Sequence, residues 1–189
     1  GPVEKATISY GYGLSVTPLQ IAQAYATLAN KGVRVSPTFI KGGQTEKLKA
    51  IDPFIASQVL HMLEGVTGPE GTASRASVKG YRVAGKTGTS RRAVAGGYEK
   101  RYISLFAGIV PVENPRFAMS IVIHEPSGGS YYGGLVSAPV FHNVMDGTLR
   151  LMDVPPDNIE QWYADKAKAT PEPDAIVDED LPPETAVMP

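Results

Sequence analysis

The stretch Gly80–Ser90, GYRVAGKTGTS, holds the residues best suited to chemistry, and it fits two motifs. Gly80, Gly85, Lys86 and Thr87 satisfy G-x-x-x-x-G-K-[ST], a loop that binds nucleotide phosphates through backbone N–H groups. The same lysine and threonine also begin K-T-G, a pattern that serine acyl-transfer enzymes carry. The residues on either side of the stretch must decide between a phosphate loop and a substrate-binding strand.

A phosphate loop needs a buried apolar strand before its first glycine and a helix that begins at its lysine. The residues before Gly80 read ASRASVK, which is not such a strand, and the residues after Thr87 read GTSRRAVAGG, without a helical apolar stripe. The later apolar run FAMSIVI is followed by His124-Glu125 rather than by a metal-binding aspartate. The sequence therefore favours a strand and leaves nucleotide hydrolysis as a minor alternative.

Side chains alternate along a strand, so Lys86 and Gly88 are expected on one face and Thr87 and Thr89 on the other. Gly88 leaves room for a substrate backbone. The Lys86 charge could bind a carboxylate or steady a proton-transfer network, and the threonine hydroxyls could donate to that carboxylate. The Thr89 N–H could form half of an oxyanion hole. K-T-G alone is a weak motif, because most occurrences are ordinary polar strand ends.

The apolar spacing predicts helices on both sides of this strand. The helices are expected to begin at Thr17-Pro18, at Asp52-Pro53 and at Ser137-Ala138-Pro139, where a capping side chain or an early proline is present. Extended runs are expected at Val33–Ile40, Tyr81–Thr89, Tyr102–Pro111 and Phe117–Glu125, with connectors at Arg91–Gly97 and Val112–Arg116. Short connectors predict antiparallel pairing, so the expected fold class is α+β, an antiparallel sheet flanked by helices.

Composition bounds the remaining possibilities. The chain of 189 residues suits one domain, and its net charge of −1 gives no sign of nucleic-acid binding. The absence of cysteine excludes disulfides and thiolate metal sites. His61, His124 and His142 lack metal-ligand spacing, so no metal and no cofactor are expected. No apolar run approaches the roughly 18 residues of a membrane span.

The C-terminal residues differ from the rest in charge. Residues 155–189 hold nine acidic residues, two lysines and seven prolines, a net charge of −7 that leaves +6 for residues 1–154. We therefore expect a body over 1–154 and a largely disordered acidic, Pro-rich tail over 155–189, with at most a helical turn or two in 159–169. The basic body suits an anionic ligand, although ordinary solubilising charge explains it equally well.

Four stretches carry a family resemblance. They are ATISYGYGLSVTPLQIAQAYATLANKG (Ala6–Gly32), GYRVAGKTGTSRR (Gly80–Arg92), RYISLFAGIVP (Arg101–Pro111) and HEPSGGSYYGGLVSAPVFHNVM (His124–Met145). In this order and spacing they resemble class B penicillin-binding proteins, and among them the septal D,D-transpeptidases that crosslink peptidoglycan in cell division. The resemblance covers nearly all of residues 5–156. It implies the C-terminal part of a penicillin-binding transpeptidase / serine β-lactamase-like domain.

That family uses three motifs, S-x-x-K, S-x-N and K-[ST]-G, and the first serine attacks the D-Ala–D-Ala carbonyl to form an acyl-enzyme. β-Lactams mimic D-Ala–D-Ala and leave an acyl-enzyme that clears slowly. In this chain no serine stands three residues before a lysine, and none stands two before an asparagine. The resemblance therefore implies that both serine motifs lie in an N-terminal part of the domain outside this sequence, and that this chain alone is inactive.

The resemblance also implies roles by position. Lys86, Thr87, Gly88 and Thr89 match the third motif and the residue after it. The two threonines would hold the substrate or β-lactam carboxylate, and the Thr89 amide would complete the oxyanion hole with the amide of the serine. Arg91 matches an arginine that supports carboxylate binding. The positions that match aromatic residues of the cleft wall are Tyr12, Tyr131 and Tyr132. An exposed loop charge and aromatic packing against a turn remain the alternatives.

Partners and location follow from the same resemblance. It implies peptidoglycan stem peptides and β-lactams as ligands, membrane proteins of the divisome as partners, and no nucleic acid. It also implies the periplasmic face of the bacterial inner membrane, with an anchor outside this chain. A β-lactamase is less favoured, because the long matched stretches follow the transpeptidase pattern. A catalytically inactive peptide- or partner-binding module stays open, because the chain lacks the serine.

Overall fold

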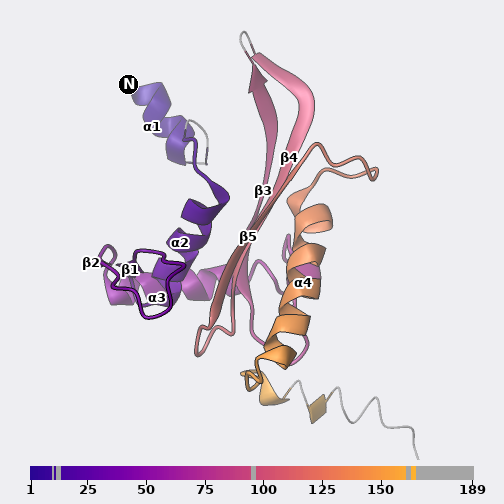
Figure 1. Cartoon of the computed structure of the whole chain (residues 1–189). Helices are drawn as coiled ribbons and strands as arrows, with labels where there is room; N and C mark the ends of the chain where they lie inside the picture. Colours follow the sequence, from indigo (N-terminus) through magenta and orange to yellow (C-terminus); the bar gives the residue numbers. More distant parts are fainter. Residues whose placement is uncertain (10, 12–13, 95–96, 161–162, 165–189) are drawn as a thin grey trace, which may run out of the picture.

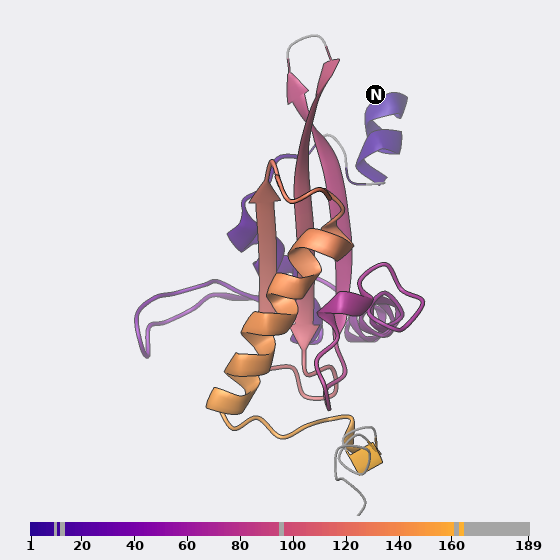
Figure 2. The same cartoon turned by 90° about the vertical axis from the view of Figure 1, so that its right-hand side faces the viewer.

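The computed structural model describes residues 1–9, 11, 14–94, 97–160 and 163–164. Its centre is a three-stranded antiparallel sheet with helices on both faces (Figure 1). Helix α4 (Gly133–Leu151) lies along one face, and helix α2 (Pro18–Ala29) lies on the other. The view turned by 90° shows α4 crossing in front of the strands (Figure 2). The expected class, an antiparallel sheet flanked by helices, is confirmed.

The sheet has the strand order β3-β4-β5, in which β3 is Ala84–Val94, β4 is Gly97–Val110 and β5 is Phe117–His124. Strand β3 begins three residues later than expected, and it continues beyond Thr89. The expected connector at Arg91–Gly97 is therefore wrong for its first residues. Pairing resumes after a register shift between Arg91 and Ala93, so the polar residues extend the hairpin instead of ending it.

Helix α4 begins four residues before the expected start at Ser137, and Pro139 lies inside it. At the seventh position of α4, Pro139 lacks the N–H that would bond to the Leu135 carbonyl, so the helix continues past it with one hydrogen bond fewer. Gly133 brings the helix against the sheet, because a Cβ there would collide with the carbonyl oxygens of Leu105 and Gly88. Gly134 likewise brings it against the Thr72 carbonyl of a neighbouring loop. The early start thus depends on a close backbone approach that helix propensity does not indicate.

The other two expected helices begin where their caps predict. The Thr17 hydroxyl accepts the Gln20 N–H at 3.2 Å, and the Gln20 side chain accepts the Thr17 N–H at 2.8 Å, which forms a capping box for α2. Asp52 caps helix α3 (Pro53–Glu64) by accepting the Phe54 N–H at 2.9 Å. These local signals are sufficient because each cap and its first turn are adjacent in sequence.

Three small elements were not expected. They are α1 (Pro2–Ser9), β2 (Lys47–Lys49) and the 3₁₀ turn η1 (Ser74–Ala76). Strand β1 (Val33–Val35) forms at the start of the extended run expected at Val33–Ile40. Strand β1 pairs antiparallel with β2, with Arg34 opposite Leu48. The expected extended run to Ile40 is wrong as a strand beyond Val35, because Pro37 has no N–H for a ladder and the chain bends and turns over 39–42.

The core lies between α4 and the sheet. Phe106 of β4 and Phe141 of α4 are fully buried, and their rings meet edge to face with centroids 5.0 Å apart. Leu149 and Val154 continue this core towards the C-terminal end of the helix. On the opposite face the Ser120 hydroxyl of β5 donates to the Pro18 carbonyl at 2.7 Å, which joins α2 to the sheet.

The predicted tail is described only at its start. Residues 161–162 and 165–189 lie outside the described residues, and so do the predicted disorder and most of the predicted turn at 159–169. The first residues after Val154 contact the body, since the Asn158 N–H donates to the Gly80 carbonyl at 3.0 Å. No helix in the described ranges is both long enough and apolar enough to cross a membrane.

Candidate functional site

The K-T-G motif lies within β3, which pairs with a neighbour on one side only among the described strands. The chain continues as a strand after Thr87, so no helix begins there and the nucleotide-loop interpretation is wrong. Thr87 is opposite Phe106, and Gly88 is opposite Leu105. A strand with an unpaired edge can bind an extended peptide through its backbone groups.

Thr87 and Thr89 face the start of helix α4. The Thr89 hydroxyl oxygen accepts the Gly133 N–H at 3.1 Å. The Thr87 hydroxyl lies 3.1 Å from the Thr72 hydroxyl, and either atom can be the donor. Because a hydroxyl that accepts one hydrogen bond keeps its own proton, Thr89 can still donate to a ligand oxygen.

The Lys86 ammonium group lies next to Thr87. Its Nζ donates to the Thr87 carbonyl at 3.1 Å and approaches the Thr87 hydroxyl at 3.3 Å. The Lys86 side chain is exposed. One ammonium group and two hydroxyls therefore converge at the edge of β3, next to the positive end of α4, an arrangement that favours an anionic group such as a carboxylate.

Thr72 was missed by sequence reasoning. It belongs to the loop between α3 and η1. Two hydrogen bonds hold this loop against β3. The Thr67 hydroxyl donates to the carbonyl of Val83, the residue just before β3, at 2.6 Å, and the Thr72 and Thr87 hydroxyls are bonded to each other. No local pattern marks Thr72, because its partner is fifteen residues away.

Aromatic rings line up beside the motif. Tyr131 stacks on Tyr102 with centroids 3.8 Å apart and an interplanar angle of 12°. Tyr132 follows with its ring centroid 4.6 Å from that of Tyr131. The Arg91 guanidinium lies 5.7 Å from the centre of the Tyr102 ring. Tyr12, the other predicted aromatic, lies outside the described residues.

Tyr102 joins Arg91 to the predicted aromatic pair, and sequence reasoning missed it. The two residues are register partners across the β3–β4 hairpin. The connector expected at Arg91–Gly97 concealed this pairing, because it ended the first strand before Arg91. A correct hairpin register would have placed the cation next to the ring.

Buried Ser104 holds the aromatic segment in place. Its hydroxyl donates to the Tyr131 carbonyl, and it lies opposite Thr89 in the ladder. The hydrogen bond of Tyr131 to the Tyr132 hydroxyl, at 3.4 Å, is the main cause that raises the pKa of Tyr131 to about 12. Tyr131 therefore stays protonated at physiological pH.

Glu125 is an ionised carboxylate at the end of the sheet where Tyr102 and Tyr131 stack. A hydrogen bond from Arg101 is the main cause that lowers the pKa of Glu125, and Arg92 lies 3.4 Å away. Glu125 and Arg101 border a pocket of about 390 Å³ that Tyr102 and Tyr131 also line. Because the carboxylate is held deprotonated and is paired with two arginines, Glu125 is not a proton donor here.

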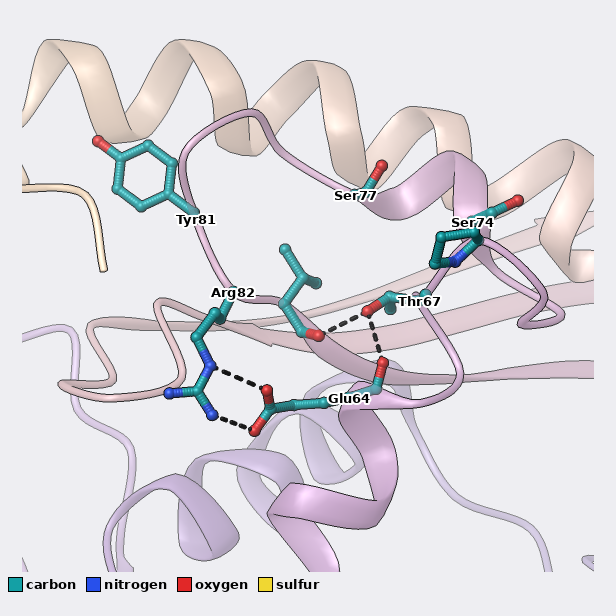
Figure 3. A pocket seen from close by; sticks show the side chains of 9 residues that line it. Glu64, Thr67, Ser74, Ser77, Tyr81 and Arg82 are labelled. Carbon is teal, nitrogen blue, oxygen red and sulfur yellow. Dashed lines mark hydrogen bonds and ion pairs between the residues drawn. The ribbon is translucent and has the colours of Figure 1, made fainter. Parts of the chain in front are cut away.

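A second pocket, of about 280 Å³, lies where the chain enters β3 (Figure 3). The Glu64 carboxylate accepts two hydrogen bonds from the Arg82 guanidinium, at 2.7 and 3.0 Å, and Thr67 bonds to Val83 beside them. Because Arg82 and Glu64 in this pocket are paired with each other, we interpret the pocket as a structural contact between α3 and the start of β3. No group of His, Cys, Asp or Glu suited to a metal occurs in the described ranges.

Comparison with known proteins identifies relatives. Residues 2–146 match the family described as Penicillin binding protein transpeptidase domain. The chain is 45% identical over 157 residues to "Peptidoglycan D,D-transpeptidase FtsI" of Escherichia coli (strain K12), covering 82% of this chain and 27% of that protein. It is 41% identical over 160 residues to "Probable peptidoglycan D,D-transpeptidase PbpC" of Pseudomonas aeruginosa, covering 84% and 28%.

Solved structures agree with this family match. The transpeptidase domain of penicillin-binding protein 3 from Burkholderia pseudomallei aligns with a TM-score of 0.74 at 39% identity, covering 83% of this chain and 49% of that one. A chain described as a peptidoglycan glycosyltransferase from Burkholderia ambifaria aligns with a TM-score of 0.70 at 38% identity, covering 83% and 47%. The chain thus spans about a quarter of the curated relatives' length and about half of these solved chains.

Proposed function

Because this chain belongs to the penicillin-binding protein transpeptidase domain family, we propose that it is the substrate-binding part of a peptidoglycan D,D-transpeptidase. One observation carries the proposal. The edge strand β3 presents Lys86, Thr87 and Thr89 together beside the first residue of α4. This is the arrangement that the K-T-G resemblance leads us to expect for binding a carboxylate.

In the proposed mechanism the edge of β3 binds the C-terminal end of a stem peptide. The Thr87 and Thr89 hydroxyls donate to the D-Ala carboxylate, and the Lys86 charge offsets its negative charge. Gly88 lets the substrate backbone lie close to the strand. The Thr89 N–H donates to the carbonyl oxygen as negative charge develops there, a contribution of about 3 kcal/mol for one such donor.

The nucleophile is proposed to come from the N-terminal part of the same domain. Its serine oxygen attacks the penultimate D-Ala carbonyl, its proton passes to the lysine of S-x-x-K, and the terminal D-Ala leaves. The amine of a second stem peptide then attacks the acyl-enzyme, which restores the serine and forms the crosslink. A β-lactam would acylate the same serine, with its carboxylate on Thr87 and Thr89.

The row of rings gives the cleft a wall. Tyr131 and Tyr132 are proposed to contact the apolar part of a substrate or drug, and Tyr102 supports Tyr131 from behind. Arg91, held over Tyr102, would add a second positive charge near the carboxylate. The proposed cellular role is septal crosslinking at the periplasmic face of the inner membrane, with membrane proteins of the divisome as partners.

Intact-mass spectrometry with benzylpenicillin tests this function. We expect a preparation that holds this chain and the serine-bearing part of the domain to gain one penicillin mass on the serine-bearing polypeptide. Replacing that serine by alanine should abolish the gain. If the preparation with its serine stays unmodified, transpeptidase chemistry is contradicted, and the alternative of an inactive peptide-binding module is favoured. Binding of a D-Ala–D-Ala peptide without acylation would support that alternative.

A further inference from the structure

Asp157 binds three backbone N–H groups with one carboxylate. Its Oδ1 accepts the Arg82 N–H at 2.7 Å, and its Oδ2 accepts the N–H groups of Val112 and Glu113 at 2.9 and 3.0 Å. Hydrogen bonds to an ionised carboxylate are about twice as strong as neutral ones. The sequence predicted a tail from residue 155 onward, yet this side chain joins two distant parts of the body.

These bonds continue the β3–β4 pairing beyond its last rung. The ladder ends with Ala84 opposite Ile109. Pro111 has no N–H, so direct pairing cannot extend regularly past it. The Asp157 carboxylate occupies this position instead, between Arg82, two residues before β3, and Val112, two residues after β4. It therefore fixes where β3 begins relative to β4.

Other contacts hold the same segment against the approach to β3. The Tyr81 hydroxyl donates to the Val154 carbonyl at 2.5 Å, and the Asn158 N–H donates to the Gly80 carbonyl. The Arg82 side chain meets Glu64 at the end of α3 (Figure 3). Residues 154–158, α3 and the start of β3 thus form one hydrogen-bonded junction.

We propose that Asp157 is a positioning residue for the Lys86–Thr89 strand, an inference that rests on the proposed function. Arg82 stands four residues before Lys86, about 13 Å along an extended strand. A strand transmits a shift along its length, because every residue is tied to the same ladder. Releasing Arg82 from Asp157 lets β3 move relative to α4, where Thr87 and Thr89 must meet the substrate carboxylate.

The test compares benzylpenicillin with its methyl ester, which lacks the carboxylate charge. Both acylation rate constants are measured by intact mass in a preparation that includes the serine-bearing part of the domain. Partial unfolding of the sample lowers the acylation rate for both compounds equally, so the ratio of the acid rate to the ester rate is unchanged. A misplaced threonine pair lowers the rate for the acid more than for the ester. We expect Asp157→Asn to lower the acid-to-ester ratio by at least about threefold, since small misplacements are costly in catalysis.

Matched variants separate positioning from a general effect. Glu160→Gln makes the same carboxylate-to-amide change at an exposed site in the same segment, and its ratio should equal that of the unmodified protein. Asp157→Glu keeps the charge and both oxygens and should recover part of the ratio. If Asp157→Asn does not fold, Asp157→Glu stands in for it, because the added methylene displaces both oxygens from the three N–H groups, and its ratio should still fall in part.

The outcomes distinguish a failure of the proposed function from a failure of positioning by Asp157. If the unmodified preparation is not acylated, or does not prefer the acid, the proposed function is contradicted. If it prefers the acid and the folded Asp157→Asn variant keeps the same ratio, positioning by Asp157 is overturned. The same conclusion follows from an unchanged ratio in Asp157→Glu when that variant has to stand in. A fall confined to the junction variants supports the inference.

Discussion

The Thr89 hydroxyl oxygen accepts the backbone N–H of Gly133 at 3.1 Å, so the residue after the K-T-G motif also caps helix α4. This bond orients the hydroxyl, because the oxygen faces the helix and the proton is left to point towards the open edge of β3. The helix that covers the core and the strand that would bind the substrate are thus joined at one side chain.

Replacing Thr89 by valine keeps the branched shape and removes the hydroxyl. We expect a loss of about 1 kcal/mol in the free energy of unfolding, as for other lost helix caps. Acylation by benzylpenicillin should slow by at least about tenfold, since a donor to the carboxylate is also lost. Urea unfolding and intact-mass kinetics measure the two effects. Thr89→Ser, which keeps the hydroxyl, should retain most of both, and equal losses in the two variants would contradict the assignment.

Gly133 and Gly147 offer a matched pair of glycine substitutions in the same helix. A Cβ at Gly133 would collide with the carbonyl oxygens of Leu105 and Gly88, whereas a Cβ at Gly147 meets nothing within 4 Å. Gly133→Ala should therefore destabilise the domain by about 1–3 kcal/mol, because the helix must move off the sheet. Gly147→Ala should stabilise it by about 0.5–1 kcal/mol through helix propensity.

Thermal or urea unfolding of both variants checks this contrast. The Gly147→Ala variant is the control, because it makes the same chemical change without a close approach. Equal stabilities for the two variants would mean that α4 does not approach β3 and β4 as closely as described. Acylation should fall only in Gly133→Ala, since Thr89 loses its partner there.

Several features of the fold follow from adjacent residues, and these the sequence predicts well. Thr17-Pro18 and Asp52-Pro53 mark helix starts because a cap and its first turn are local. The start of α4 has no such signal, because Tyr132 gives no side-chain cap and Gly133 is a poor helix former. Its position depends on a backbone contact with the sheet.

The candidate site shows the same division. The motif strand with Thr87 and Thr89 on one face follows from the alternation of a strand. The partners Thr72 and Tyr102 depend on loop placement and hairpin register, which no local pattern contains. Asp157 was assigned to a tail on composition, because prolines and acids surround it, and its three backbone partners become visible only in the folded chain.

Tyr131 should titrate at high pH. Its pKa is raised from 10.0 to about 12, chiefly by the hydrogen bond to the Tyr132 hydroxyl. Since the folded pKa lies above the unfolded one, the neutral ring contributes stability that is fully present below pH 10.0 and is lost as pH rises towards about 12. Absorbance near 295 nm follows the tyrosinate, and Tyr131→Phe identifies its signal. Tyr132→Phe should return the pKa towards its ordinary value, and an unchanged pKa would contradict the pairing.

Glu125 should show the opposite dependence on pH. Its pKa is lowered, first by the hydrogen bond from Arg101 and also by the charges of Arg101 and Arg92. A carboxyl whose folded pKa lies below its unfolded pKa stabilises the fold above the unfolded value, and this stability is lost as pH falls through the folded pKa. Carbon-detected NMR of the side-chain carboxyl measures this titration directly.

Two arginine variants separate the contributions to this shift. Arg101→Gln removes the leading cause and should raise the pKa of Glu125 more than Arg92→Gln does, because Arg92 acts mainly through its charge at 3.4 Å. Salt should reduce the effect of Arg92 more than that of Arg101, since screening weakens an exposed charge contact before it breaks a short hydrogen bond. A larger shift in Arg92→Gln would mean that the carboxylate is held from the β3 side of the hairpin and not by β4.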